Sequence, residues 1–241
     1  MDINIRILQV GKSTDNFLVD SQYCPSDARK IREKFLIDEQ HEGENIDSLN
    51  PWFCEITALY WLLNNTDSEY IGLTHYRTDF FEDSSFKVMG PDTIKKLLDR
   101  HDVIAGLWQY YDGRHGKDLM ANLDKWLGYD IDNFMNVLSE HEQGFADFLQ
   151  EYMLIGHMAC NCFIAKRSII EPVFERLMRL IEFYREVTPR CESNLRSDGW
   201  IFEVLLGALL EYSYADIRYS RLVKFKRGLR SIQQQTFLQD K

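Results

Sequence analysis

Two apolar segments separated by a short polar turn dominate the pattern of hydrophobic and polar positions. Positions 51–63 are apolar on nearly every side of a helix, and positions 70–73 form a short apolar run. A helix that is apolar all round is buried, and a short apolar run bounded by turn residues is typical of a buried strand. Asn50 is a favourable N-cap and Pro51 suits the first helical position, so the sequence predicts one unbroken helix ending near Leu63.

Helical and strand patterns alternate along the rest of the chain with short links. Ser168 and Glu171 are spaced as a capping box at the start of one helix. The predicted strands cover 3–10, 102–108 and 159–166, and the predicted helices cover 27–35, 92–100, 117–152, 168–187 and 199–212. This order predicts an α/β fold with a mixed, mostly parallel central sheet flanked by helices and a helix-rich C-terminal half. Because we find no linker or repeat, we expect residues 1–241 to form a single domain.

The charge balance and the cysteines narrow the class of protein. A formal net charge of −10 opposes nucleic-acid binding by the molecule as a whole. The five cysteines are odd in number and form no paired CxxC set, which indicates reduced thiols and a reducing compartment. We find no signal-peptide pattern and no apolar run near the ~20 residues of a membrane helix, so a cytoplasmic protein is expected.

Polar side chains are concentrated where the predicted strand at 70–73 ends. His75, Tyr76 and Arg77 follow that strand, and open α/β sheets bind ligands at the carboxyl ends of their strands. An arginine fork neutralises a diphosphate without a metal, and a histidine can donate to a leaving phosphate. The alternative is a structural triplet in which Arg77 pairs with Glu55, a carboxylate in an apolar helix that needs a partner when buried.

Several separate stretches carry a resemblance to one bacterial family. They are residues 43–46, 49–51, 54–61, 70–77, 115–119, 157–164 and 199–203. In this order they resemble the capsular-polysaccharide and related surface-glycan glycosyltransferases catalogued as domain of unknown function 4422. Family members usually have a His-Lys strand ahead of a segment like 7–11, with which this chain begins, and a second arginine where this chain has Thr78 and Asp79.

The resemblance implies a GT-A-like fold and transfer of a sugar from a nucleotide sugar, expected to be UDP-linked. The acceptor would be a glycan or a lipid-linked glycan of surface-polysaccharide synthesis. Residues 1–110 would form the nucleotide-binding half, and residues 111–241 the acceptor half. The alternative is a catalytically inactive nucleotide- or sugar-binding protein, or a scaffold, of the same pathway.

The same resemblance assigns groups of residues to the donor and the acceptor. The donor or its nucleotide would be bound by Gln9, Gly11, Lys12, Asn45, Asn50, Glu55, Tyr76, Arg77 and Asp79. The acceptor or the sugar would be bound by His115, Asp118, His157 and Asn161. Structural alternatives stay open, namely turn and cap roles for Asn45 and Asn50, a solvated helix start for His115 and Asp118, and a core histidine at His157.

Two carboxylates are candidates for the base that deprotonates the acceptor hydroxyl. Glu203 matches the family's glutamate, whereas Asp198 has no clear counterpart; an N-cap for Asp198 and a buried arginine partner for Glu203 are the alternatives. His75 would act on the leaving phosphate. No cofactor is predicted to be required, and Asp79 is the one carboxylate through which Mg²⁺ or Mn²⁺ would bind, although a lone carboxylate is weak support for a site.

The C-terminal stretch reverses the sign of the overall charge. Residues 218–230 carry six basic and no acidic side chains, interleaved with apolar ones. Basic residues near an anionic lipid surface each contribute about 1 kcal/mol, so this stretch predicts peripheral contact with the inner face of the membrane. The alternative is a final strand or helix whose basic side chains pair with the acidic body.

Overall fold

The computed structural model describes residues 4–82, 87–108, 131–155, 157–192, 195–213, 215–220, 222–225 and 232–233. Two predicted acceptor residues, His115 and Asp118, lie outside this part of the chain, as do several basic residues of 218–230. Within the described residues, no helix is both long and apolar enough to cross a membrane.

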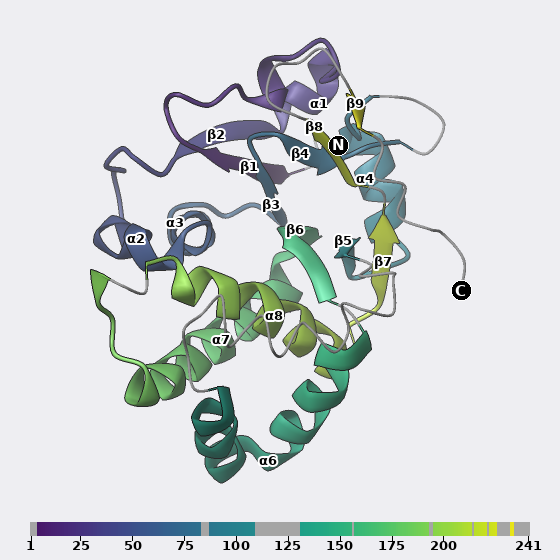
Figure 1. The fold of residues 1–241 in the computed structure, drawn as a ribbon. Coiled ribbons are helices and arrows are strands. Elements are labelled where there is room, and N and C mark those ends of the chain that lie inside the picture. Colours follow the sequence, from purple (N-terminus) through teal and green to yellow (C-terminus); the bar gives the residue numbers. More distant parts are fainter. Residues whose placement is uncertain are drawn as a thin grey trace.

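A mixed sheet forms the centre of the molecule (Figure 1). Its main strands are β1 (Ile5–Gly11), β2 (Arg32–Leu36), β3 (Tyr70–His75), β5 (Val103–Trp108), β6 (His157–Lys166) and β7 (Ile217–Ser220). They lie in the order β2-β1-β3-β6-β5-β7, and β6 alone among these six runs antiparallel to its neighbours. This confirms the predicted mixed, mostly parallel sheet.

A small antiparallel ribbon extends the sheet from the end of β3. It consists of β4 (Thr78–Phe80), β8 (Leu222–Phe225) and β9 (Ile232–Gln233). His75 pairs with Thr78, so Tyr76 and Arg77 form the two-residue turn between β3 and β4. The His75–Arg77 triplet is therefore a tight hairpin at the carboxyl end of a parallel strand.

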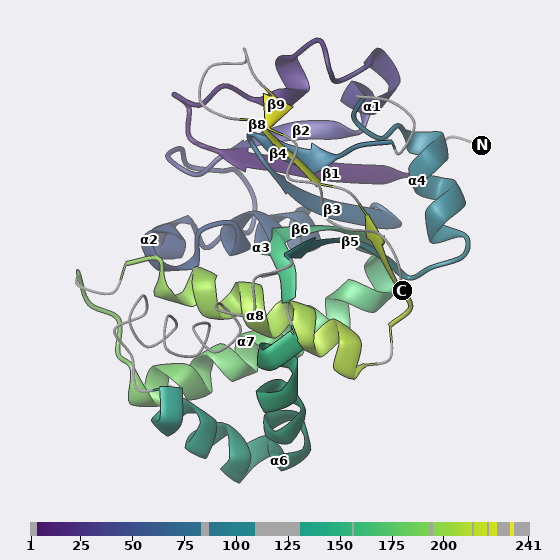
Figure 2. The same ribbon diagram turned by 45° about the vertical axis from the view of Figure 1, so that its right-hand side comes forward.

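Helices cover both faces of the sheet (Figure 2). The helices α3 (Ile56–Asn65), α6 (Ile131–Ile155), α7 (Arg167–Val187) and α8 (Ser197–Tyr212) lie on one face, and α1 (Ser26–Lys30) and α4 (Pro91–Leu98) on the other. Shorter helical turns are η1 (Leu18–Asp20), η2 (Asp47–Leu49) and α2 (Asn50–Phe53). The predicted helix-rich C-terminal half is confirmed.

Alternation along β1 shows how the two cores form. Leu8 and Val10 face the larger core under α3, α7 and α8, whereas Ile5 and Ile7 face the smaller core that α4 covers. Because successive strand residues point to opposite faces, one apolar strand supplies both cores. Its buried polar residue, Gln9, requires a partner, and the structure provides one in Asp79.

Three local predictions are wrong. The helix predicted from Asn50 is interrupted at Cys54, whose φ of 51° lies outside the helical region, and Leu49 rather than Asn50 occupies its N-cap position. Residues 27–35 form a short helix and then strand β2, because pairing with β1 outweighs the helical spacing of the apolar positions. The helix α7 begins at Arg167 without a side-chain cap, so Ser168 and Glu171 form no capping box.

Candidate functional site

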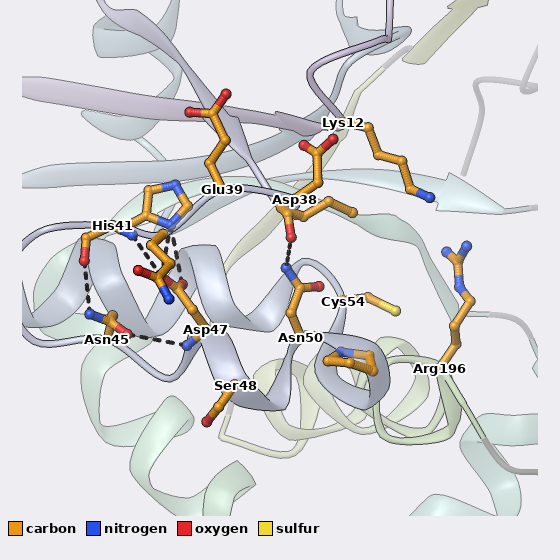
Figure 3. Close-up of a pocket in the computed structure, with 13 residues that line it drawn as sticks. Lys12, Asp38, Glu39, His41, Asn45, Asp47, Ser48, Asn50, Cys54 and Arg196 are labelled. Atoms are coloured by element: carbon orange, nitrogen blue, oxygen red, sulfur yellow. Dashed lines mark hydrogen bonds and ion pairs between the residues drawn. The ribbon is translucent and has the colours of Figure 1, made fainter. Parts of the chain in front are cut away.

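A pocket of about 770 Å³ opens where β1 and β2 end (Figure 3). Its walls come from the residues after β1, the loop after β2, the start of α2 and the residue before α8. It is lined by Lys12, Ile37, Asp38, Glu39, Gln40, His41, Asn45, Asp47, Ser48, Asn50, Pro51, Cys54 and Arg196. The carboxyl edge of parallel strands is where open α/β sheets bind ligands.

One end of the pocket carries two cations from opposite walls. Lys12 follows β1, and Arg196 precedes α8; both side chains are exposed and lie near Cys54 (Figure 3). Arg196 has a left-handed backbone with φ 70°, and its N–H donates to the carbonyl of Pro51 at 2.8 Å. Such a conformation in a residue other than glycine costs energy and is a pointer to function. This bond fixes the loop before α8 against α2.

Cys54 lies near Arg196 at the cationic end and also near the carboxylates of Glu55 and Glu203. Burial, followed by the charge of Glu55, raises the pKa of the Cys54 thiol to about 12, while Arg196 hydrogen-bonds to the thiol and opposes the rise. The charge of Glu203 adds to the increase. A Cβ placed on Gly199 would lie 3.1 Å from both Cβ and Sγ of Cys54, so α8 approaches this point closely. The thiol therefore stays neutral.

A mostly buried carboxylate and a histidine form an ion pair beside Cys54. His75 Nε2 lies 2.6 Å from Glu55 Oε1, with side chains 24% and 13% exposed. Burial alone would raise the pKa of Glu55, but the charge and hydrogen bond of His75, together with Arg196, hold it below its ordinary value. The partner of Glu55 is thus His75, and the prediction of an Arg77 partner is wrong. Arg77 instead lies over the Tyr76 ring, 5.4 Å from its centroid.

The other end of the pocket is built around His41. Its ring stacks on Phe35, with centroids 3.7 Å apart and planes 5° from parallel. Asp47 accepts from the His41 N–H at 2.7 Å and lies 3.1 Å from Nδ1. Asn45 donates to the carbonyls of His41 and Gly43 at 2.9 and 3.0 Å, and so organises the loop. Asn45 has the predicted turn role and also lines the pocket.

The wall between the two ends presents hydrogen-bond acceptors. Ser13 donates to Asp38 through its N–H at 2.8 Å and its hydroxyl at 2.7 Å. These bonds lower the pKa of Asp38 below its ordinary value, and the bond from the Ser13 hydroxyl has the larger effect. Next to Asp38, Asn50 Nδ2 donates to the carbonyl of Ile37. Asn50 thus lines the pocket without acting as a cap.

The two candidate bases lie in different surroundings. Asp198 is fully buried, and its oxygens pair with Arg185 and, at 2.9 Å, with Nε of Arg190. A carboxylate held by two guanidiniums inside the protein is a poor base, so Asp198 has a structural role here. Glu203 is partly exposed and lies one helical turn after Gly199, on the face of α8 that meets Cys54.

The sequence comparison identifies the family. Residues 7–213 match the family model described as domain of unknown function (DUF4422). The chain belongs to the DUF4422 family. This match confirms the resemblance inferred from the separate sequence stretches. No curated protein sequence is detectably similar to the chain.

The fold of this DUF4422 chain is similar to that of a glycosyltransferase. One similar structure is the apo form of WbbM, a bifunctional glycosyltransferase, with a TM-score of 0.64 and 14% identity, and the match covers 91% of this chain. The DUF4422 chain covers 45% of the WbbM chain. At this identity the comparison establishes the fold, and it agrees with the predicted fold class.

Two predicted donor residues of the DUF4422 chain form a buried network. Asp79 is fully buried and accepts from Arg32 Nε at 2.9 Å, Arg32 Nη2 at 3.0 Å and Gln9 Nε2 at 3.2 Å. Gln9 in turn accepts from the Val19 N–H at 2.8 Å. The polar atoms of Asp79 and Gln9 thus hold β1, β2 and β4 together, and neither residue is among those that line the pocket. A donor role for these two residues, and a metal at Asp79, stay predictions.

Gly11 and Tyr76 pack against each other at the floor of the site. A Cβ on Gly11 would lie 2.7 Å from Tyr76 Cβ and 3.0 Å from the Phe17 ring. The backbone of Tyr76 bonds to the Val10 carbonyl and to the Leu18 N–H. Gly11 and Tyr76 therefore pack at the edge of the sheet next to the pocket. Neither residue is among those that line the pocket.

Asn161 lies at the same edge as His75. The last pair in the ladder between β3 and β6 is Leu73 with Phe163. His75 lies two residues beyond Leu73 on β3, and Asn161 lies two residues before Phe163 on the antiparallel strand β6. Asn161 is buried, has φ 51°, and its Oδ1 has no hydrogen-bond partner among the described residues. The side chain of His157 lies outside the described part. The sugar-binding role of both residues stays a prediction.

Several lining residues were missed from sequence, namely Asp38, Glu39, His41 and Arg196. The first three follow β2, which the helical spacing of residues 27–35 concealed. Arg196 lies in a loop with no periodicity, and only its backbone geometry marks it. In the part of the chain that the structure describes, no group of three or more His, Cys, Asp or Glu side chains is arranged to hold a metal ion.

Proposed function

We propose that this protein transfers a sugar from a nucleotide-sugar donor, UDP-linked by preference, to a glycan or lipid-linked glycan acceptor. The observation that carries the proposal is the pocket at the carboxyl edge of β1 and β2. Its cationic end, with Lys12 and Arg196, adjoins the Glu55–His75 ion pair. Cations next to a protonatable pair suit a diphosphate leaving group, and the glycosyltransferase-like fold supports the class of reaction.

The cationic end would hold the diphosphate and the charge that develops on it. A guanidinium pairs with phosphate oxygens through two parallel hydrogen bonds, and an ammonium adds a point charge. His75, kept in place by Glu55, would donate its proton to the departing phosphate oxygen. Arg77 lies beside His75 in the β3–β4 turn, and its role as a further diphosphate ligand stays part of the proposal.

Glu203 is the preferred base. In an inverting transfer, the acceptor oxygen would bond to the anomeric carbon while the bond from that carbon to the diphosphate oxygen breaks. The hydroxyl proton passes to Glu203, and the bonding electrons leave with the nucleoside diphosphate. Glu203 is favoured over Asp198 because it is partly exposed on the α8 face near Cys54, whereas Asp198 is held by two arginines.

The test uses the purified full chain with UDP and UDP-hexoses. UDP should stabilise the protein by mass action, and a UDP-hexose should be hydrolysed slowly or transferred. Arg196→Ala should weaken UDP binding about tenfold or more, since it removes hydrogen bonds to a charged group. The matched control is Arg100→Ala, which removes an exposed guanidinium outside the pocket. Failure of UDP to bind would refute the proposal.

Two further points of the proposal have their own tests. UDP-dependent stabilisation without hydrolysis or transfer would favour the inactive binding protein instead. We expect no required metal, because cationic side chains stand at the diphosphate end; complete loss of transfer in EDTA, restored by Mn²⁺, would contradict this.

Contact with the membrane through residues 218–230 is also part of the proposal. The described part of this stretch lies in β7 and β8, and residues 221 and 226–230 lie outside the described residues. Six basic side chains and no acidic one support attraction to anionic lipid. Co-sedimentation with anionic vesicles, at low and high salt, tests it; absence of binding at low salt would contradict it.

A further inference from the structure

The carboxylate of Asp38 stands on the pocket wall next to the cationic end. Figure 3 shows it between Lys12 on one side and Glu39 and His41 on the other. The two bonds from Ser13 use one lone pair on each oxygen of Asp38, at 2.8 Å to Oδ1 and 2.7 Å to Oδ2. Each carboxylate oxygen has a second lone pair. The bonds from Ser13 orient the carboxylate, and a ligand can reach Asp38 because it is exposed.

An anion at this place constrains which ligand group can lie against it. A diphosphate bound by Lys12 and Arg196 would be repelled by a nearby carboxylate. A group with hydroxyl donors would instead form charge-assisted hydrogen bonds with it. In a nucleoside diphosphate the group directly attached to the diphosphate is the ribose, which carries two neighbouring hydroxyls.

The start of α2 supplies a second acceptor of fixed orientation, close to the backbone that precedes Asp38. Asn50 Nδ2 donates to the Ile37 carbonyl, and only the amino group of an amide can make that bond. Its Oδ1 therefore turns to the pocket side (Figure 3). Asp38 and Asn50 therefore place two acceptors on this part of the pocket lining, which suits a ligand segment rich in hydroxyl donors.

We propose that Asp38 accepts hydrogen bonds from both ribose hydroxyls of the donor nucleotide. This makes the pocket selective for ribonucleotides over 2′-deoxyribonucleotides. Ser13 is the positioning residue that holds the carboxylate. The inference rests on the proposed function, and it adds a specificity for the ribose to that function.

The experiment compares UDP with 2′-deoxyuridine diphosphate by titration calorimetry on the full chain. Loss of the 2′-hydroxyl removes one hydrogen bond to the charged carboxylate, so UDP should bind about tenfold to hundredfold more tightly than the deoxynucleotide. Equal affinity for the two nucleotides would overturn the inference and leave the proposed function standing. No binding of UDP would instead refute the proposed function itself.

Variants then assign the selectivity to Asp38. In Asp38→Ala the ratio of the two dissociation constants should fall close to one, whatever the change in overall affinity. Ser13→Ala should reduce the ratio in part. Asp20→Ala is the matched control, since it removes an exposed carboxylate outside the pocket, paired with Lys34, and should keep the full ratio. An unchanged ratio in a folded Asp38→Ala protein would overturn the inference.

Discussion

Replacing Asp79 with asparagine is expected to destabilise the protein by about 3–5 kcal/mol, because it leaves a buried guanidinium without its counter-charge. Asp79 and Arg32 both have fully buried side chains. Asp79 receives two hydrogen bonds from Arg32, at 2.9 and 3.0 Å, and one from Gln9 at 3.2 Å. An asparagine of the same shape keeps one acceptor, supplies no charge and turns its amino group toward the guanidinium.

The expected loss is large for a chain of this length. Total stabilities are about 5–15 kcal/mol, so the variant would lose a large part of its stability. Each kcal/mol shifts Tm by about 2–4 °C in a chain of 150–250 residues, which predicts a fall of about 6–20 °C. Urea unfolding followed by circular dichroism, together with a thermal scan, measures both quantities.

The control is an exposed ion pair whose cation, Lys34, lies on β2 like Arg32. Asp20 lies 2.6 Å from Lys34, with side chains 58% and 42% exposed, and Asp20→Asn should cost less than about 1 kcal/mol. If Asp79→Asn also changes the unfolding free energy by less than about 1 kcal/mol, the buried-pair reasoning is refuted. Normal stability with lost UDP binding would instead favour a direct donor role for Asp79.

Three further predictions concern the site. Glu203→Gln should lower transfer by about 10²–10⁴-fold with UDP affinity nearly unchanged, and full transfer by this variant would exclude Glu203 as the base. The pKa of Glu55 is lowered in the folded protein because His75 and Arg196 outweigh burial. The stability that Glu55 contributes is therefore present above its ordinary pKa of 4.5 and lost as pH falls through the lower folded value. Glu55→Gln should flatten that acid limb in urea unfolding at several pH values, and an unchanged slope would argue against the ion pair. Burial raises the pKa of Cys54 to about 12, so iodoacetamide at neutral pH should label exposed Cys191 well before Cys54 in a mass-spectrometric time course; equal rates would contradict a buried, neutral thiol.

The amino-acid pattern alone predicted most of the helices and strands whose apolar residues recur at regular spacing. Three elements were predicted from spacing: the apolar strand β3, the amphipathic helix α7 and the apolar helix α8. In each segment, the order of apolar and polar residues indicates which side chains are buried. The family was also evident from short stretches, and the match over residues 7–213 confirmed it.

Features that depend on a partner from elsewhere in the chain were decided by tertiary structure. β2 is a strand because β1 offers a parallel ladder, and its Arg32 is buried because Asp79 is there to pair with it. Glu55 required a cation when buried, and the sequence analysis predicted Arg77, two residues after His75. The hairpin geometry selected His75.

Some residues of the pocket were predicted from the sequence, and others were found only in the folded structure. The sequence indicated Lys12, Asn45 and Asn50, which line the pocket, whereas Arg196 and Asp38 became candidates only in the folded chain. A side chain in an irregular loop carries no periodic signal, so its position depends on which elements the loop joins. Local patterning determines which face of an element is buried, but a pocket needs residues that the folded sheet brings together from distant parts of the chain.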